Sequence, residues 1–357
     1  MNRDGRRLSI RWPAYLVLLS LACGAMALVA QCEHQAAANV SAAPSGDTRV
    51  NPNLFVMRLT AVDKTGVPLT TLRAEDVRVL EDGVPQEIQL LTRVTDEPIQ
   101  LTLGVDLSIS QTEVLPLNIA AAHKFIDTLL RAKADLAAVY SFSGQGMLKQ
   151  PLTNDRKALH DVLNDLHTEK PPNYIGHGVI IGSPPIIRGD QQLSGATSLW
   201  DAIRNMAQGV YPTAHTAHRV TILMTDGVDT SSTSRKREAL EALMRAGVYV
   251  YAIGLAGEDG YLNKDDLRKL TEETGGRAFF PRNNKELDQV IEQIEQELRA
   301  PYLLGYYPAA KPTNNARRKL QIEIINPELR KQNWRLAYPH GYFFTDLTKS
   351  AAPAINH

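Results

Sequence analysis

Cysteine is almost absent from this chain. Only two occur among 357 residues, Cys23 and Cys32, and both precede residue 33. The remaining residues therefore offer no disulfide, no thiolate metal site and no cysteine nucleophile. A chain of this length has room for one large hydrophobic core with smaller flanking modules, and that core must supply the stability.

The sequence also lacks an excess of charge of either sign and the common catalytic motifs. Lys and Arg together number 39, as do Asp and Glu, so we predict no nucleic-acid partner. There is no GxSxG, Walker or GxGxxG motif, and the pair His215 and His218 has no third ligand at a recognisable spacing. We expect this pair in a loop before a strand at Val220. We predict a binding protein and not an enzyme; the enzymatic alternative, a metal-dependent hydrolase, lacks a candidate general base.

The first 31 residues have the layout of a signal peptide. Several arginines precede an uncharged stretch from Pro13 to Gln31 that is rich in Leu, Val and Ala. We therefore predict an extracytoplasmic protein, periplasmic or secreted. The apolar stretch is just long enough to span a bilayer, so a retained N-terminal membrane anchor is the alternative to cleavage. A lipid anchor at Cys23 or Cys32 is less favoured, because Ser20 and Gln31 fit a lipoprotein signal poorly.

Changes in composition and periodicity divide the rest of the chain. Alternation from Leu54 to Val62 and the turn pair Asp82-Gly83, between strands expected at 77–80 and 86–91, predict a small β module. Past Pro301 we predict paired strands at 302–307 and 319–325 and a third at 334–338. The expected boundaries are a disordered linker at 32–50, a β module at 51–97, a central domain at 98–300, a C-terminal β extension at 301–345 and a disordered tail at 346–357.

The central domain alternates apolar strands with amphipathic helices. Such βα alternation predicts an α/β fold with a doubly wound, Rossmann-like sheet. The expected strands are 99–105, 136–142, 220–224 and 248–255. The expected helices are 115–130, 156–166, 198–207, 235–246, 265–274 and 285–298.

Oxygen-bearing side chains follow the strands of this domain. Asp106, Ser108 and Ser110 alternate in the loop after the first strand, Thr197 precedes a helix, and Asp226 follows the strand that ends at Met224. Loops at the carboxyl edge of an open sheet form a ligand-binding crevice. Without His or Cys, this set favours a hard cation, Mg²⁺ first, with Mn²⁺ or Ca²⁺ as alternatives.

The order of these loops resembles that of von Willebrand factor A (VWA) domains. The segments 106–110, 195–202 and 224–227 correspond to the three motif loops of that family, and the resemblance runs from about Pro98 to Leu298. It implies a metal-ion-dependent adhesion site. Its metal ligands, direct or through water, would be Asp106, Ser108, Ser110, Thr197 and Asp226. The resemblance also implies a protein partner that offers an Asp or Glu carboxylate to the metal.

Two further segments are similar to the exported bacterial group of this family. They are Glu75–Gln86, which reads EDVRVLEDGVPQ, and Tyr302–Pro308, which reads YLLGYYP. This chain departs from the family pattern at Leu107 and Ile109, whose apolar side chains we expect to crowd the rim of the metal site. The segment 170–195 is either a functional loop beside the site or an insertion without contacts.

The predicted function is capture of a protein partner through a divalent metal. The alternative is a structural scaffold of an envelope assembly whose metal site is empty or vestigial. Asp229, three residues past Asp226, is either an acceptor that supports the site or an exposed turn residue.

Overall fold

The computed structural model describes residues 54–63, 65–168, 196–211, 217–257, 260–310 and 316–343. The chain divides into two compact units, residues 1–52 and 53–357, and only the second contains described residues. The predicted signal peptide or anchor, the linker, the tail and the segment 170–195 lie outside the described residues. Within the described part of the chain, no helix is both long enough and apolar enough to cross a membrane.

A six-stranded sheet forms the centre of the second unit, in the order β10-β9-β8-β5-β6-β7. Its strands are β5 Ile99–Asp106, β6 Leu136–Phe142, β7 Gly146–Thr153, β8 His218–Met224, β9 Val248–Ile253 and β10 Ala278–Phe279. All neighbours are parallel except β6 and β7. The four predicted strands are present, whereas β7 was not predicted. Strand β7 lies at the sheet edge, where Pro151 and polar residues are tolerated, so it has no continuous apolar run.

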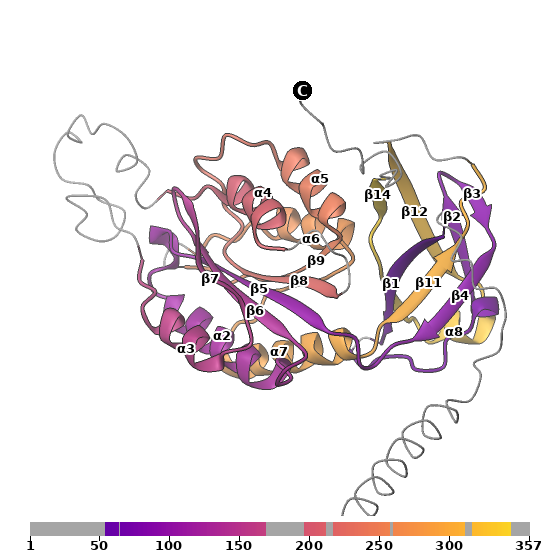
Figure 1. Cartoon of the computed structure of the whole chain (residues 1–357), viewed down its shortest axis with the longest axis horizontal. Helices are drawn as coiled ribbons and strands as arrows, with labels where there is room; N and C mark the ends of the chain where they lie inside the picture. The colour runs from indigo at the N-terminus through magenta and orange to yellow at the C-terminus, as the bar shows by residue number, and fades with distance from the viewer. Residues whose placement is uncertain are drawn as a thin grey trace, which may run out of the picture. The chain divides into compact units, whose positions relative to one another are not determined.

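Helices cover both faces of this sheet (Figure 1). One face packs against α2 Leu115–Leu129, α3 Arg156–Asn164 and α7 Asn284–Arg299. The other packs against α4 Leu199–Gly209, α5 Lys236–Ala246 and α6 Lys264–Glu273. Strands covered on both faces are buried along their whole length, as β5, β8 and β9 are. The prediction of a doubly wound α/β fold is confirmed.

Two four-stranded sheets form a second, all-β core. Their orders are β13-β1-β11-β4 and β14-β12-β2-β3. The strands are β1 Phe55–Val62, β2 Val77–Glu81, β3 Val84–Gln86, β4 Ile88–Arg93, β11 Tyr302–Tyr306, β12 Arg317–Ile324, β13 Arg335–Ala337 and β14 Gly341–Phe343. Side chains from both sheets, such as Leu59 and Leu304 from one and Val79 and Ile322 from the other, share one buried cluster. The segments before and after the central domain thus share both sheets (Figure 1). Two short helices, the 3-10 turn η1 Ala74–Asp76 and α8 Pro327–Lys331, adjoin these sheets.

Two strand predictions in this β core are wrong. Strands β11 and β12 do not pair: β11 lies between β1 and β4, and β12 lies between β2 and β14. Nearness in sequence favoured a hairpin, but the connection between them is long enough to cross to the other sheet. The strand expected at 86–91 is also interrupted, because β3 pairs with β2 and β4 pairs with β11. The predicted turn at Asp82-Gly83 is confirmed, since both residues have positive φ, 49° and 82°, as a tight hairpin turn requires.

Candidate metal centre

The predicted metal ligands lie in three loops at one edge of the central sheet. Asp106 is the last residue of β5, and after Leu107 and Ser108 the chain enters the 3-10 turn η2 Ile109–Gln111. Asp226 comes two residues after β8, the parallel neighbour of β5. Parallel neighbours end at the same sheet edge, so the two aspartates approach each other. Thr197 lies two residues before α4.

Four of the five predicted residues form a continuous chain of contacts. The Ser108 amide donates to Asp106 Oδ1 at 2.9 Å, and the hydroxyls of Ser108 and Ser110 lie 3.1 Å apart. The Ser110 hydroxyl donates to Asp226 Oδ2 at 2.6 Å. The oxygens of Asp106, at the end of β5, and of Asp226, in the loop after β8, are thereby gathered in one place.

Thr197 joins this group through its backbone. Its amide donates to the Thr230 hydroxyl at 2.9 Å, and its carbonyl accepts from the amides of Thr230 at 2.8 Å and Ser231 at 3.0 Å. Among the hydrogen bonds of the described residues, none links the Thr197 hydroxyl to the other four side chains. The loop after Asp226 therefore holds Thr197 in position while its hydroxyl makes no contact within the ligand set.

The two carboxylates are unfavourably placed in the absence of a cation. Asp106 and Asp226 are 0% and 1% exposed. Burial, followed by the negative charge of Asp226, raises the pKa of Asp106 to about 7. Short hydrogen bonds offset part of this cost, including one of 2.5 Å from the Thr225 hydroxyl to Asp106 Oδ2. Two buried carboxylates with serine hydroxyls between them form a donor set that suits a hard divalent cation. The residues present therefore fit the metal that the resemblance implies.

Gln111 is a buried contact of Asp226 that sequence reasoning missed. Its Nε2 donates to Asp226 Oδ2 at 2.9 Å, and its Oε1 accepts from Asn118 Nδ2 at 3.3 Å. Gln111 and Asn118 are both fully buried. The sequence feature that could have pointed to this contact is a pair of amide side chains, with Gln111 just before the helix expected at 115–130 and Asn118 inside it. Because Gln111 donates to the same oxygen as Ser110, Asp226 is held by two side chains from the loop after β5.

Asp229 positions the start of α4. Its Oδ1 accepts from the Leu199 amide at 2.9 Å and from the Ser232 hydroxyl at 2.5 Å. It is only half-buried, but an amide at a helix N-terminus needs an acceptor outside the helix. Asp229 is therefore not an exposed turn residue, and its hydrogen bonds hold the start of α4, two residues past Thr197.

Two expectations about individual residues are wrong. Leu107 does not crowd the rim of the site: it is 3% exposed and packs in the hydrophobic core with Val105. The reason is that its amide pairs with the Phe142 carbonyl at 2.7 Å, which continues the strand alternation past Asp106. His218 is not in a loop, because it begins β8 and is 4% exposed, with its ring edge-on to Tyr249. The other histidine of the pair noted in the sequence, His215, lies outside the described residues.

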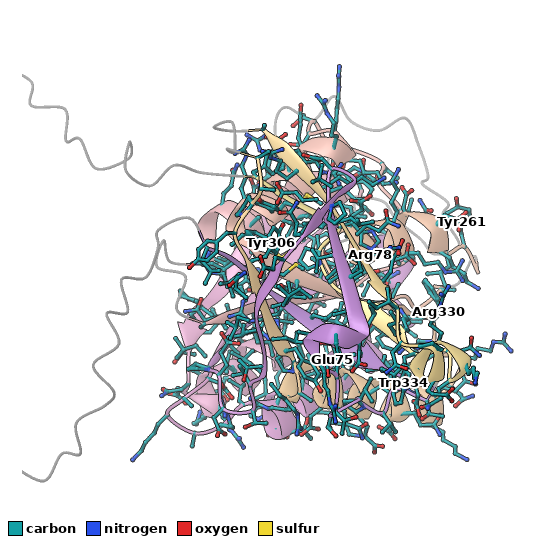
Figure 2. The ribbon with its side chains drawn as sticks, turned by 90° about the vertical axis from the view of Figure 1, so that its right-hand side faces the viewer. Glu75, Arg78, Tyr261, Tyr306, Arg330 and Trp334 are labelled. Atoms are coloured by element: carbon teal, nitrogen blue, oxygen red, sulfur yellow. The ribbon has the colours of Figure 1, made fainter. Side chains whose placement is uncertain are left out.

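A cavity of about 630 Å³ lies beside these loops. Its lining includes Val114, Leu255, Phe280 and the exposed Tyr261. Figure 2 shows Tyr261 projecting from the surface of the protein. The loop that forms one wall passes so close to Ser110 that a Cβ atom at Gly257 would lie 1.7 Å from the Ser110 carbonyl oxygen. The cavity wall and the serine loop are therefore in direct contact.

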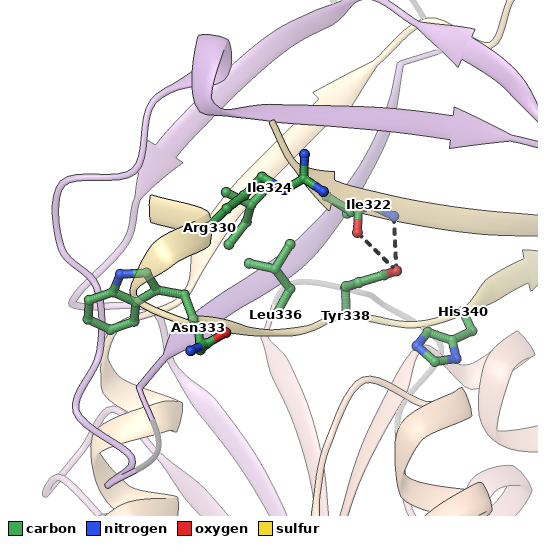
Figure 3. A pocket seen from close by; sticks show the side chains of 8 residues that line it. Ile322, Ile324, Arg330, Asn333, Leu336, Tyr338 and His340 are labelled. Atoms are coloured by element: carbon green, nitrogen blue, oxygen red, sulfur yellow. Dashed lines mark hydrogen bonds between the residues drawn. The ribbon is translucent and has the colours of Figure 1, made fainter. Parts of the chain in front are cut away.

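A second cavity, of about 390 Å³, belongs to the β core. Figure 3 shows Ile322 and Leu336 in its lining, with Tyr338 across from Ile322. The Tyr338 hydroxyl accepts from the Ile322 amide at 2.9 Å and donates to its carbonyl at 3.4 Å. This cavity contains none of the predicted metal ligands in its lining.

Comparison with known proteins finds one matching family model. The von Willebrand factor type A domain model matches residues 186–293, which include Thr197 and Asp226 and begin after Asp106. The match covers less than a third of the chain, and it confirms the predicted resemblance to VWA domains. Comparison with curated proteins finds no match.

Solved structures of related folds are distant in sequence. One is BatB from Bacteroides thetaiotaomicron, with 16% identity and a TM-score of 0.42 over 56% of this chain and 98% of that chain. Another is a von Willebrand factor type A protein from Catenulispora acidiphila, with 13% identity and a TM-score of 0.42 over 84% and 76%. A third is proximal thread matrix protein 1 from the mussel byssus, whose structure is described with a zinc-occupied metal-ion-dependent adhesion site (MIDAS) motif. It has 16% identity and a TM-score of 0.45 over 59% of this chain and 49% of that chain.

Proposed function

We propose that this protein captures a protein partner outside the cytoplasm through a divalent cation bound at the edge of its VWA sheet. The observation that carries the proposal is the pair of buried carboxylates, Asp106 and Asp226, joined through the hydroxyls of Ser108 and Ser110. Buried like charges persist in a folded protein when a counter-charge compensates them. The family match favours an interaction module over an enzyme.

Five residues would hold the cation in this proposal. Asp106, Ser108, Ser110 and Asp226 already share contacts, and the backbone of Thr197 is bonded to Thr230 and Ser231 in the loop after Asp226. Oxygen ligands of this kind favour Mg²⁺, with Mn²⁺ and Ca²⁺ as the other hard candidates. When bound, such a cation supplies a coordination position that a carboxylate can fill.

The partner is expected to present an Asp or Glu side chain. The protein itself offers two carboxylates, which together balance one dication, and Mg²⁺ in protein sites usually keeps several waters, so a partner carboxylate can take the position of one water. Gln111 and Thr225 keep the two aspartates in place by donating to them from the protein side. The extracytoplasmic location is proposed from the basic and apolar N-terminal segment of the sequence.

A structural scaffold is the second candidate, and one observation favours it. Asp226 Oδ2 already accepts from both Ser110 and Gln111, and Asp226 Oδ1 accepts from the Val228 amide at 2.9 Å. A site whose oxygens are permanently satisfied by protein donors needs no metal. In that case the β core would make the functional contacts, and the metal loops would only stabilise the domain.

Calorimetric titration of the full chain with Mg²⁺ and with Mn²⁺ tests the first proposal. Wild type should bind one cation, and Asp106→Ala should not. Glu113→Ala is the matched control, because this exposed carboxylate lies close to the serine loop without contacting it through a described hydrogen bond. Equal heats from wild type and Asp106→Ala would contradict the metal site and favour the scaffold.

Partner chemistry is tested with immobilised peptides. Each peptide carries a single Asp, and its matched copy carries Asn at the same position. We expect retention of some Asp peptides with Mg²⁺ present, loss with EDTA and loss in Asp106→Ala. Retention that ignores EDTA and the Asp-to-Asn change would contradict carboxylate capture through the metal.

A further inference from the structure

Two histidines face each other between helices α2 and α3. His123 comes from α2 and His160 from α3, and their Nδ1 atoms lie 2.5 Å apart. The rings are stacked, with centroids 4.8 Å apart and planes inclined by 28°. Both side chains are only partly buried, and that of His160 is 28% exposed. An ion from solvent therefore has access to the pair.

The second nitrogen of each ring faces an oxygen from the opposite helix. His123 Nε2 lies 3.1 Å from Asn164 Oδ1, and His160 Nε2 lies 3.0 Å from Asp127 Oδ1. Each helix thus contributes a histidine and, four residues later, an acceptor for the other histidine. A carboxylate and an amide oxygen accept but do not donate, so both Nε2 atoms carry hydrogen when the Asn164 amide has this orientation.

This arrangement leaves both Nδ1 atoms as lone pairs. A neutral imidazole has one protonated nitrogen, and here that is Nε2 in each ring. Two lone pairs directed at each other across 2.5 Å repel unless a positive charge lies between them. With both rings in this tautomer, the pair requires a cation between the two Nδ1 atoms, either a proton or a metal ion.

We propose that His123 and His160 bind a divalent first-row transition metal, of the Cu²⁺, Ni²⁺ or Zn²⁺ class, through their two Nδ1 atoms. Imidazole nitrogen suits these ions, in contrast to the hard cation expected at the serine loop. Histidines that bind metals usually donate their other ring N–H to a carboxylate or carbonyl oxygen, and both rings here do so, to Asp127 and Asn164.

Two protein ligands and water would complete the site. Across the described ranges, no cluster of three or more His, Cys, Asp or Glu side chains is arranged around a metal position, so this is a two-nitrogen site. With metal–nitrogen bonds of about 2.0 Å and a tetrahedral angle, the two nitrogens would stand roughly 3.3 Å apart. The rings must then separate by somewhat less than about 1 Å, which partly exposed side chains reach by small rotations.

Two accounts without a metal compete with this proposal. In the first, the two Nδ1 atoms share a proton. In the second, the Asn164 side-chain amide is turned over so that its NH₂ group donates to His123 Nε2, and His123 Nδ1 then donates to His160 Nδ1 in an ordinary hydrogen bond. In both of these cases the pair packs α2 against α3 without a metal. They predict no specific affinity for Cu²⁺ at the two rings.

Titration of the full chain with Cu²⁺, followed by electron paramagnetic resonance, separates these accounts. All samples carry Asp106→Ala, so the serine loop cannot contribute and the outcome is independent of the proposed function. The test variants are His123→Gln and His160→Gln. His167→Gln is the matched control, because His167 lies just after α3, is exposed and contacts only the Asp165 carbonyl among the described hydrogen bonds.

The parent should bind one Cu²⁺ with a spectrum that shows coupling to two imidazole nitrogens. Each test variant should lose at least about tenfold in affinity and the two-nitrogen pattern, while His167→Gln should bind as the parent does. Circular dichroism and thermal unfolding in EDTA verify that the variants fold. Unchanged affinity in folded His123→Gln and His160→Gln, or a parent spectrum without nitrogen coupling, would overturn the proposal.

Discussion

Replacement of Asp106 by asparagine should raise the stability of the metal-free protein while it abolishes the response to Mg²⁺. Asparagine has nearly the same shape as aspartate but no charge, so it removes the repulsion from Asp226. Its oxygen can still accept from the Ser108 amide, and its NH₂ group can donate to the Thr225 hydroxyl. A variant that is more stable yet functionally inactive is the signature of a carboxylate kept for a ligand.

The magnitude follows from the pKa of Asp106. Burial raises it from the ordinary value of 3.8 to about 7. A pKa that is higher in the folded state means that the unfolded chain releases its proton first, so stability falls as pH rises through this interval. At about 1.4 kcal/mol per pH unit, the full cost above pH 7 is about 4 kcal/mol. The Thr225 hydroxyl loses its acceptor in the variant, which costs about 1 kcal/mol, so the expected net gain is about 3 kcal/mol.

The assay is urea unfolding of both proteins in EDTA, at pH values from about 4 to 8. The difference in unfolding free energy should be small near pH 4 and should grow to about 3 kcal/mol near pH 7.5. With saturating Mg²⁺, wild type should gain stability and the variant should not. Asp265→Asn, at a side chain that is 95% exposed, is the control and should show neither effect. A variant less stable than wild type in EDTA at pH 7.5 would refute the reasoning.

Two further substitutions test the packing around the site and the core. Gly257→Ala places a Cβ atom 1.7 Å from the Ser110 carbonyl oxygen, so the serine loop must shift. The Mg²⁺ affinity measured by calorimetry should then fall by about 10- to 100-fold. Gly209→Ala is the control, because its Cβ atom would meet nothing within 4 Å, and it should keep the wild-type affinity. Arg277→Ala removes the partner, at 3.0 Å, of the buried Glu297 carboxylate, and urea unfolding should show a loss of about 3 kcal/mol or more. A loss below about 1 kcal/mol would mean that Glu297 is protonated or finds another partner.

Local patterns in the sequence were sufficient for most of the central domain, although not for its edge strand β7. The apolar run of β5, the helical periodicity of α2 and the turn residues Asp82-Gly83 each depend on a few consecutive residues, and the structure has these elements where they were expected. The order of the three motif loops also identified the family. Because parallel strands in a doubly wound sheet present their carboxyl ends at one edge, the approach of Asp106 and Asp226 could be anticipated as well.

Other features depend on which distant residues meet, and only the tertiary structure decided them. Strand β1 pairs with β11 across more than two hundred residues, because both have an apolar face that the same core can bury. Gln111 reaches Asp226, and His123 meets His160, only because their elements pack side by side. Periodicity determines which face of an element is apolar, but it carries no information about the partner of that face. The sequence therefore specified the elements and the ligand loops, whereas packing chose the strand partners and the side-chain contacts that support the site.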